Sequence, residues 1–420
     1  MSAPARAYGC VITGAGVVSP LGLGLEATRA ALRRGQSGIG PIRGFDTRGF
    51  PVNCAGEVDE PGLEGGARRP EAMAELALDE ALAQAGLERP AAGGALDPRR
   101  AVSFAVGKPT LDLEGLARRR GDWAAACEPA QLLRRLPEIE QQRAAADPSA
   151  VLRRLARRSG AGGGLYSSYT ACASGNDAIG LGKRLIERGE ADLVIAGATD
   201  AQVHPLSLLE FELLSALSHE PAERACRPFD RERTGFVVGE GAAVVILEEA
   251  GHARRRQARV RAQLAGYGSS LDCYGLTKCH PQGRGAALAI RAALADAALA
   301  PADIDYLNAH GTGTVLNDQA EAAAIRQVWG ADTARLPVSS TKAMTGHLLT
   351  AASAVEAVIT LLALEEGLLP PNLNYQHRDP DCDLHLVIHP GARAPLRTAM
   401  SNGFGFGGQN SSLILQAATA

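Results

Sequence analysis

One cysteine lies in a setting that favours nucleophilic chemistry. Cys172 stands in residues 169–175, Tyr-Thr-Ala-Cys-Ala-Ser-Gly, just before a run, residues 178–186, whose apolar side chains recur at helical spacing. A cysteine at the start of a helix meets free backbone N–H groups and the positive end of the helix dipole. We therefore expect a lowered thiol pKa and a thiolate at neutral pH. A buried, unreactive cysteine is the alternative that this stretch alone leaves open.

Two histidines in the second half of the chain complete a candidate catalytic set. His310 lies in residues 308–314, Asn-Ala-His-Gly-Thr-Gly-Thr, and His347 ends residues 340–347, Ser-Thr-Lys-Ala-Met-Thr-Gly-His. A third stretch, residues 401–408, is rich in glycine. Loops at the ends of strands are where α/β sheets place ligands. Each histidine alone is more often a structural residue, but together with a candidate nucleophile these stretches predict one catalytic centre.

The elements that must position these residues alternate between strands and helices. We predict strands over residues 8–18, 101–107, 192–197, 242–248, 260–268, 304–309, 336–339, 384–388 and 412–415, and a loop over 403–408. We predict helices over residues 25–35, 70–86, 283–298, 318–329 and 351–366, and two or three with basic faces over 111–159. The alternation indicates mainly parallel or mixed sheets covered by helices. Its order repeats in each half, with a basic turn at 251–261 as the border.

Composition excludes several classes of function. The formal charge of −3 gives no general basis for binding nucleic acid or an anionic membrane. The eight cysteines are scattered without metal-ligand spacing, so reduced thiols of the cytoplasm are expected. We find no secretion-signal pattern and no apolar run of membrane-spanning length, so membrane insertion is not expected.

The motifs together resemble the β-ketoacyl-acyl-carrier-protein synthases, the elongating condensing enzymes of fatty-acid and type II polyketide synthesis. The matching stretches are residues 170–175, 227–230, 235–241, 310–314, 340–347 and 403–410. The resemblance implies an α/β, thiolase-like fold, with two similar βαβαβ-type halves in a five-layer α-β-α-β-α arrangement. We place these halves at residues 1–252, with the cysteine, and 253–420, with both histidines and the lysine.

The resemblance assigns chemical roles to five side chains. Cys172 would accept the acyl chain as a thioester, which divides the condensation into two easier steps. His310 and His347 would hold the malonyl thioester carbonyl and stabilise the enolate formed when carbon dioxide leaves. Lys342 would lie behind them, paired with Glu356. Some members of the family bind a monovalent cation near this pair, but the chemistry needs no metal ion and we assign no metal ligands.

The resemblance also assigns the surroundings of this centre. The backbone N–H groups of Cys172 and Phe406 would form an oxyanion hole, and Phe406, with Phe404 beside it, would gate the acyl pocket. Three threonines would contact the phosphopantetheine arm of the carrier protein: Thr277, Thr312 and Thr314. Because carrier proteins are acidic, Arg68 and Arg69, and the arginines of residues 118–158, are candidates for docking; a solvated basic face is the alternative.

The implied activity is 3-oxoacyl-[acyl-carrier-protein] synthesis by decarboxylative Claisen condensation, in fatty-acid or rather in polyketide and other secondary-metabolite synthesis. The expected partners are the acyl carrier protein, acyl and malonyl thioesters, and a second subunit in a homodimer or a ketosynthase heterodimer. No cofactor is expected beyond the carrier's phosphopantetheine. The alternatives are a non-elongating, chain-length-determining subunit and a CoA-dependent thiolase. A thiolase is disfavoured because residues 403–410 lack a second cysteine.

Overall fold

The computed structural model describes residues 9–60, 63, 68–91, 93–109 and 147–418. Of the region expected to form basic helices, one helix lies within these residues, α5 (Pro148–Ser159). The backbone groups left free at both ends of α5 have local partners. Asp147 accepts the N–H of Ser149 at the start, and Gly160 ends the helix in the left-handed conformation. The rest of that prediction lies outside the described residues.

Most strands of the described chain form one long mixed sheet with an internal repeat, and β3 (Ile39–Pro41) and β4 (Cys54–Gly56) form a separate two-stranded sheet. From its middle the first half runs outward as β1 (Cys10–Ser19), β8 (Glu240–Glu249), β7 (Leu193–Ala201), β5 (Arg100–Val106) and β6 (Leu165–Tyr166). The second half runs outward in the same chain order as β9 (Ala262–Leu271), β13 (Gln409–Ala417), β12 (Thr398–Gly405), β10 (Tyr306–Asn308) and β11 (Val338–Ser339). The halves join through a short antiparallel pairing of β1 with β9. The predicted repeat is therefore present.

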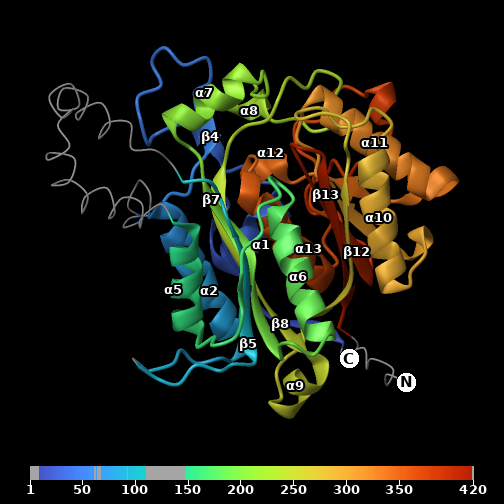
Figure 1. Ribbon diagram of the computed structural model, residues 1–420. Coiled ribbons are helices and arrows are strands. Elements are labelled where there is room, and N and C mark those ends of the chain that lie inside the picture. The colour runs from blue at the N-terminus through green and yellow to red at the C-terminus, as the bar shows by residue number, and fades with distance from the viewer. Residues whose placement is uncertain (1–8, 61–62, 64–67, 92, 110–146, 419–420) are drawn as a thin grey trace, which may run out of the picture.

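Helices cover both faces of each half, which gives the five layers that the family resemblance implied (Figure 1). Two helices, α6 (Ser174–Glu187) and α13 (Ala352–Glu366), fill the space between the halves. The outer layers are α2 (Arg69–Ala85) with α5 on one side and α10 (Arg284–Ala297) with α11 (Val315–Trp329) on the other. The other α-helices of the described residues are α1 (Gly24–Arg34), α7 (Pro205–Leu213), α8 (Ala222–Ala225), α9 (Ala250–Arg255) and α12 (Lys342–Thr345). The other strands are β2 (Gly22–Leu23), which pairs with β1, and the antiparallel pair of β3 with β4.

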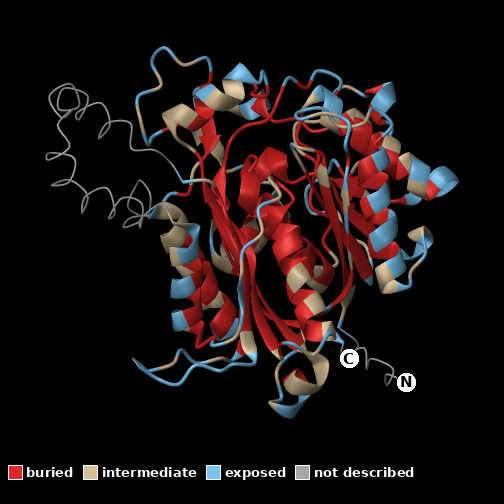
Figure 2. Cartoon of the chain, viewed as in Figure 1, coloured by how far each residue is buried: buried red, intermediate tan, exposed pale blue. Residues whose placement is uncertain are grey.

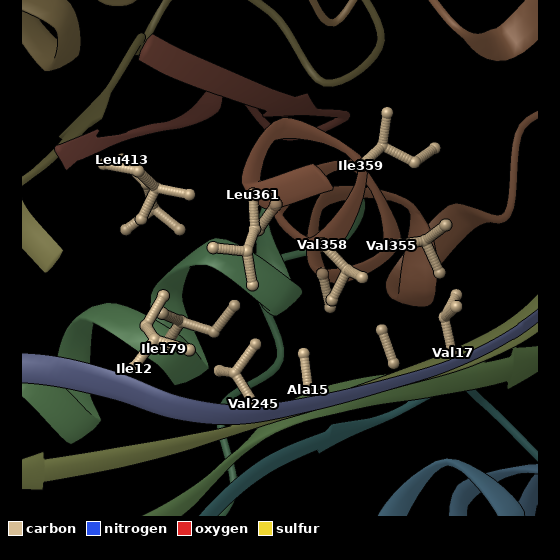
Figure 3. Close-up of a cluster of buried hydrophobic side chains, with 14 of the residues drawn as sticks. Ile12, Ala15, Val17, Ile179, Val245, Val355, Val358, Ile359, Leu361 and Leu413 are labelled. Carbon is tan, nitrogen blue, oxygen red and sulfur yellow. The ribbon is translucent and has the colours of Figure 1, made fainter. Parts of the chain in front are cut away.

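The central helices are buried because their sequences are apolar on all sides. Every residue of α13 from Ala352 to Leu364 is buried, whereas the outer helices expose one polar face (Figure 2). Ile179 of α6 and Val358 of α13 pack with Ile12 of β1 and Leu413 of β13 in one core that spans both halves (Figure 3). This shared core fixes the loops of both halves against each other at the site.

Three predicted elements were wrong. Residues 384–388 do not form a strand; only Leu386 makes a bridge, to Val338, because β11 ends after two residues. Residues 403–405 belong to β12 and not to a loop, since the glycines permit close packing: a Cβ on Gly403 would lie 2.7 Å from the Cβ of Ser353. Residues 250–255 form α9 where a turn was expected. The division after residue 252 falls within α9 and stays a prediction.

Candidate active site

Cys172 lies in a strained turn directly before α6. The preceding residue, Ala171, has a φ of 47°, which is unusual for a residue with a side chain. The hairpin of β12 and β13 closes over this turn, because a Cβ on Gly405 would come within 2.9 Å of the Cys172 nitrogen. Only glycine fits there, so the second half of the chain packs directly against the nucleophile.

The expectation of a lowered thiol pKa was wrong. Cys172 is buried, and this burial raises the pKa of its thiol to about 12. The positive charge of Lys342 acts in the opposite direction but is the smaller effect. The resting cysteine is therefore a neutral thiol, whose proton must leave when sulfur attacks a thioester.

The three predicted catalytic residues meet in one cavity. Cys172, His310 and His347 line a pocket of about 330 Å³. The two imidazole rings have centroids 5.3 Å apart and are almost perpendicular. Residues up to 175 positions apart in the sequence, from 172 to 347, thus share one site, because the start of α6 and the segments that follow β10 and β11 converge between the two halves.

Hydrogen bonds assign the same tautomer to both histidines. Nδ1 of His310 accepts from Nζ of Lys342 at 3.3 Å, and Nδ1 of His347 accepts the N–H of Leu349 at 3.3 Å. The proton of each neutral ring therefore lies on Nε2. Burial, followed by the charge of Lys342, lowers both imidazole pKa values well below the usual value. Two neutral N–H donors are thus provided beside Cys172.

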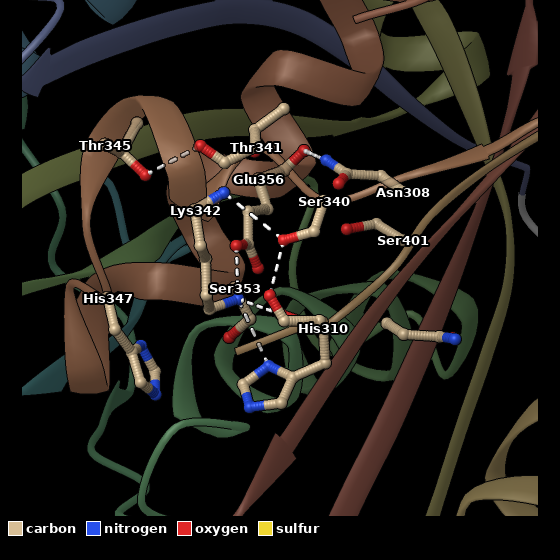
Figure 4. Close-up of polar contacts among 12 residues, drawn as sticks. Asn308, His310, Ser340, Thr341, Lys342, Thr345, His347, Ser353, Glu356 and Ser401 are labelled. Carbon is tan, nitrogen blue, oxygen red and sulfur yellow. Dashed lines mark hydrogen bonds and ion pairs between the residues drawn. The ribbon is translucent and has the colours of Figure 1, made fainter. Parts of the chain in front are cut away.

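Lys342 and Glu356 form a buried ion pair behind His310 (Figure 4). Nζ of Lys342 lies 2.5 Å from Oε1 of Glu356 and also donates to the carbonyl oxygen of His310 at 2.6 Å. Burial raises the pKa of Glu356 to about 7, against the opposing effect of Lys342. The ion pair keeps the charged ammonium group of Lys342 beside His310, where it donates a hydrogen bond to the neutral imidazole.

Glu321 on α11 is a site residue that was not predicted from the sequence. Its carboxylate accepts the backbone N–H groups of His310 at 2.9 Å and Gly311 at 2.7 Å, and the Asn402 amide at 3.1 Å. Burial raises its pKa to about 7. Glu321 therefore fixes the loop that carries His310. The available signal was an acidic residue within an otherwise alanine-rich stretch of a predicted helix.

Phe404 and Phe406 differ in position. Phe404 is buried with its ring centroid 5.8 Å from that of His310, whereas Phe406 is 37% exposed on the turn between β12 and β13. Both line the cavity. Phe236, which the sequence reasoning missed, packs edge-on against His347 at 5.1 Å. The exposed position of Phe406 suits the predicted gate, whereas the buried Phe404 forms part of the cavity wall.

The predicted substrate-binding threonines line the same cavity. Thr277, Thr312 and Thr314 all contribute to its surface, and the hydroxyls of Thr312 and Thr314 lie 2.9 Å apart. They supply polar groups to a wall that otherwise includes Leu276 and Val315. The placement fits a polar arm inserted from solvent, and contact with phosphopantetheine stays a prediction.

Arg68 and Arg69 have different environments. Arg68 is exposed, as docking requires. The guanidinium of Arg69 is held inside the fold by the buried carboxylate of Glu240, at 2.5 and 2.8 Å, and by the Val58 carbonyl oxygen at 2.6 Å. The structure therefore gives Arg69 a structural role in place of the predicted docking role.

Three buried oxygen atoms beside the ion pair have no hydrogen-bond partner: Asn308 Oδ1, Glu356 Oε2 and Ser401 Oγ (Figure 4). A set of oxygen ligands suits a hard cation. These residues fit the monovalent cation that the resemblance implies, since their oxygen atoms would be its ligands. Within the described residues, no group of three or more His, Cys, Asp or Glu side chains is arranged to hold a metal ion.

Comparison with known families decides the assignment. Residues 9–253 match the family described as beta-ketoacyl synthase, N-terminal domain, and residues 261–376 match beta-ketoacyl synthase, C-terminal domain. The chain belongs to the β-ketoacyl synthase family. It is therefore an acyltransferase with the thiolase-like fold, and such enzymes receive acyl groups on phosphopantetheine without an added cofactor.

Relatives of this β-ketoacyl synthase include proteins with two kinds of name. It is 38% identical over 417 residues to putative polyketide beta-ketoacyl synthase 1 of Streptomyces cyaneus, covering 96% of this chain and 97% of the relative. It is 37% identical over 419 residues to 3-oxoacyl-[acyl-carrier-protein] synthase 2 of Coxiella burnetii, with the same coverage. A relative named as a polyketide synthase and one named as a 3-oxoacyl-[acyl-carrier-protein] synthase are thus similar at almost the same level.

Solved structures show the same fold in ketosynthases of type II systems. One is the type II polyketide synthase carrier protein AntF in complex with its ketosynthase AntDE, with a TM-score of 0.87, 33% identity and coverage of 98% of this chain and 100% of that chain. Another is the ishigamide ketosynthase/chain length factor, with a TM-score of 0.84, 33% identity and coverage of 99% and 100%. In the described part of this synthase, no helix is long and apolar enough to cross a membrane.

Proposed function

We propose that the protein is an elongating ketosynthase that joins an acyl chain on Cys172 to a malonyl group on a carrier protein. The observation that carries this proposal is the single cavity shared by the Cys172 thiol and two neutral imidazoles whose Nε2 atoms bear protons. A nucleophile for acyl transfer and two donors for a developing oxyanion are the groups that the reaction requires.

The first step transfers the acyl group. The sulfur of Cys172 attacks the thioester carbon, the carrier's sulfur leaves with its electron pair, and the thiol proton of Cys172 passes to that leaving sulfur. The tetrahedral oxyanion between these states needs backbone donors, and the N–H groups of Cys172 and Phe406 are those we assign. The strained turn at Ala171 keeps the sulfur at the start of α6.

The second step forms the new carbon–carbon bond. The bond from the malonyl α-carbon to its carboxylate breaks, carbon dioxide leaves, and the electron pair forms an enolate whose oxygen is held by His310 and His347. The enolate carbon then attacks the acyl carbon on Cys172. The sulfur of Cys172 leaves with its electron pair as a thiolate, which takes up a proton from solvent to restore the neutral thiol. Neutral histidines suit this step because they donate hydrogen bonds to the enolate oxygen but do not transfer a proton to it. A transferred proton would convert the enolate into an enol, which is a weaker nucleophile.

We assign the enzyme to secondary-metabolite synthesis, with a ketosynthase-like subunit as its partner and the cytoplasm as its compartment. The polyketide relative and the ketosynthase/chain length factor structure support this choice. A non-elongating role is disfavoured by the complete set of Cys172, His310, His347 and Lys342. The test is to express the protein alone and with the ketosynthase-like subunit from its own host, and to supply acyl and malonyl carriers. Chain extension supports the proposal, and its absence in both preparations contradicts it.

The thiolase alternative gains one observation, since Cys279 also lines the cavity. Its thiol donates to the carbonyl oxygen of Leu316 at 3.4 Å. A thiolase would need this second cysteine and would release no carbon dioxide. We expect Cys279→Ala to retain condensation with stoichiometric release of carbon dioxide, and loss of condensation in this variant would favour thiolase chemistry.

A further inference from the structure

A chain of hydrogen bonds joins the two halves of the molecule beside the nucleophile. Tyr267 on β9 donates its hydroxyl to Oδ1 of Asp177 on α6 at 2.8 Å. The other oxygen of this buried carboxylate, Oδ2, accepts the hydroxyl of Thr170 at 2.6 Å. Thr170 stands two residues before Cys172. None of these three side chains has a part in the chemical steps proposed above.

The chain ends on the strained turn that presents Cys172. Ala171 has a φ of 47°, a left-handed conformation that costs free energy for any residue with a Cβ. The hydroxyl of Ser174 accepts the Thr170 N–H at 2.8 Å and donates to the Ala171 carbonyl oxygen at 2.6 Å. Such strain persists only where the surroundings hold it. The carboxylate of Asp177 is hydrogen-bonded to this turn through the hydroxyl of Thr170.

Tyr267 is itself fixed from several sides. Its N–H donates to Oδ2 of Asp296 at 2.9 Å, and the guanidinium carbon of Arg184 lies 5.9 Å from the centre of its ring. The ring packs on Gly180 of α6, where a Cβ would lie 2.3 Å from Cδ2 of Tyr267. Glycine inside a helix is normally unfavourable. At position 180 it provides the space that lets the tyrosine hydroxyl reach Asp177.

We propose that Tyr267, Asp177 and Thr170 form a positioning brace that holds the turn at Ala171 and aims the Cys172 thiol into the cavity. The consequence for catalysis rests on the proposed function: the brace sets the rate at which Cys172 takes up an acyl group. It does not set the rate of decarboxylation, which depends on His310 and His347. Without the tyrosine hydroxyl the turn relaxes toward negative φ and the sulfur leaves its position.

Two variants test the brace by different routes. Tyr267→Phe removes only the hydroxyl group. Gly180→Ala adds a methyl group that displaces the Tyr267 ring, although alanine itself stabilises a helix. For each, three rates are measured: alkylation of Cys172 by iodoacetamide, acylation of Cys172 by an acyl carrier, and release of carbon dioxide from a malonyl carrier. We expect the two cysteine rates to fall about tenfold, as for a lost hydrogen bond of about 1.4 kcal/mol, with carbon dioxide release unchanged.

Tyr306→Phe is the matched control. Tyr306 is a buried tyrosine whose hydroxyl lies 2.8 Å from Oγ of Ser339, so this variant also loses one buried hydrogen bond. We expect it to leave all three rates unchanged. Wild-type alkylation rates in both Tyr267→Phe and Gly180→Ala would overturn the brace, and so would equal slowing of all three rates. A wild-type enzyme that is alkylated but never acylated contradicts the proposed function, and the brace is then decided by alkylation alone.

Discussion

Nζ of Lys342 lies 3.3 Å from Nδ1 of His310 and 2.6 Å from the carbonyl oxygen of the same histidine. The lysine ammonium group thus donates to Nδ1, the nitrogen that would take up a proton if the ring became charged. His310 is therefore kept neutral, with its proton on Nε2. Glu356 makes this arrangement tolerable by pairing with the lysine in the interior. The activity of His310 therefore depends on a charged pair that is placed behind it.

We expect loss of this ion pair to lower both stability and activity, and a double variant distinguishes the two losses. Lys342→Met leaves the buried Glu356 carboxylate unpaired, so we expect the free energy of unfolding in urea to fall by about 3–5 kcal/mol. Replacing both residues, as Lys342→Met with Glu356→Met, should restore most of that stability but not decarboxylation. If the single variant is as stable as the wild type, the ion pair is not formed as described.

The donor role of His347 can be tested with a matched pair of variants. His347→Gln retains an N–H near the position of Nε2, whereas His347→Leu has similar size and no donor. Removal of one oxyanion donor typically costs about 10²- to 10³-fold in rate. We expect that loss for His347→Leu in carbon dioxide release from a malonyl carrier, and a clearly smaller loss for His347→Gln. Equal losses would show that the ring acts by shape alone.

The reactivity of Cys172 should depend on pH in a defined direction. Burial raises the thiol pKa to about 12, so the fraction of thiolate increases with pH throughout the neutral range. We expect the alkylation rate of Cys172 by iodoacetamide, followed by mass spectrometry, to rise from pH 6 to about pH 9 without a plateau. A plateau beginning below pH 8 would mean that the helix N-terminus outweighs burial.

The two arginines near α2 should respond differently to substitution. Arg68 is exposed, so Arg68→Glu should raise KM for an acyl carrier about three- to tenfold with kcat unchanged. Arg69→Met should instead lower stability, since it leaves Glu240 unpaired in the interior. Steady-state kinetics and urea unfolding separate these effects. An unchanged KM in Arg68→Glu would place carrier docking elsewhere.

The sequence predicted the repeated order of elements and the convergence of Cys172, His310 and His347, because strand ends and glycine-flanked loops have local signatures. It could not predict the thiol pKa of Cys172. That value depends on burial by residues of both halves of the chain that are distant in sequence, such as Phe236 and Leu349, which no local pattern reveals. Similarly, Arg69 looked like a docking residue because its partner, Glu240, is 171 positions away.

Glu321 and Tyr267 were missed for the same reason. Both act through contacts that the local sequence pattern does not show: Glu321 with the backbone of the loop that carries His310, and Tyr267 with Asp177 on α6. The glycines of β12 were interpreted as a loop because glycine signals either a turn or close packing. Only the neighbouring Ser353 on α13 distinguishes the two cases for Gly403.

In the proposed reaction, Cys172 carries the growing chain while His310 and His347 promote decarboxylation of the malonyl group. The most direct measurement is the intact mass of wild type and Cys172→Ala after incubation with an acyl carrier, with carbon dioxide release from a malonyl carrier recorded in parallel. We predict an acyl adduct on Cys172 in the wild type, and no adduct but continued carbon dioxide release in Cys172→Ala. An adduct on another residue, or a Cys172→Ala variant that still extends chains, would contradict the account.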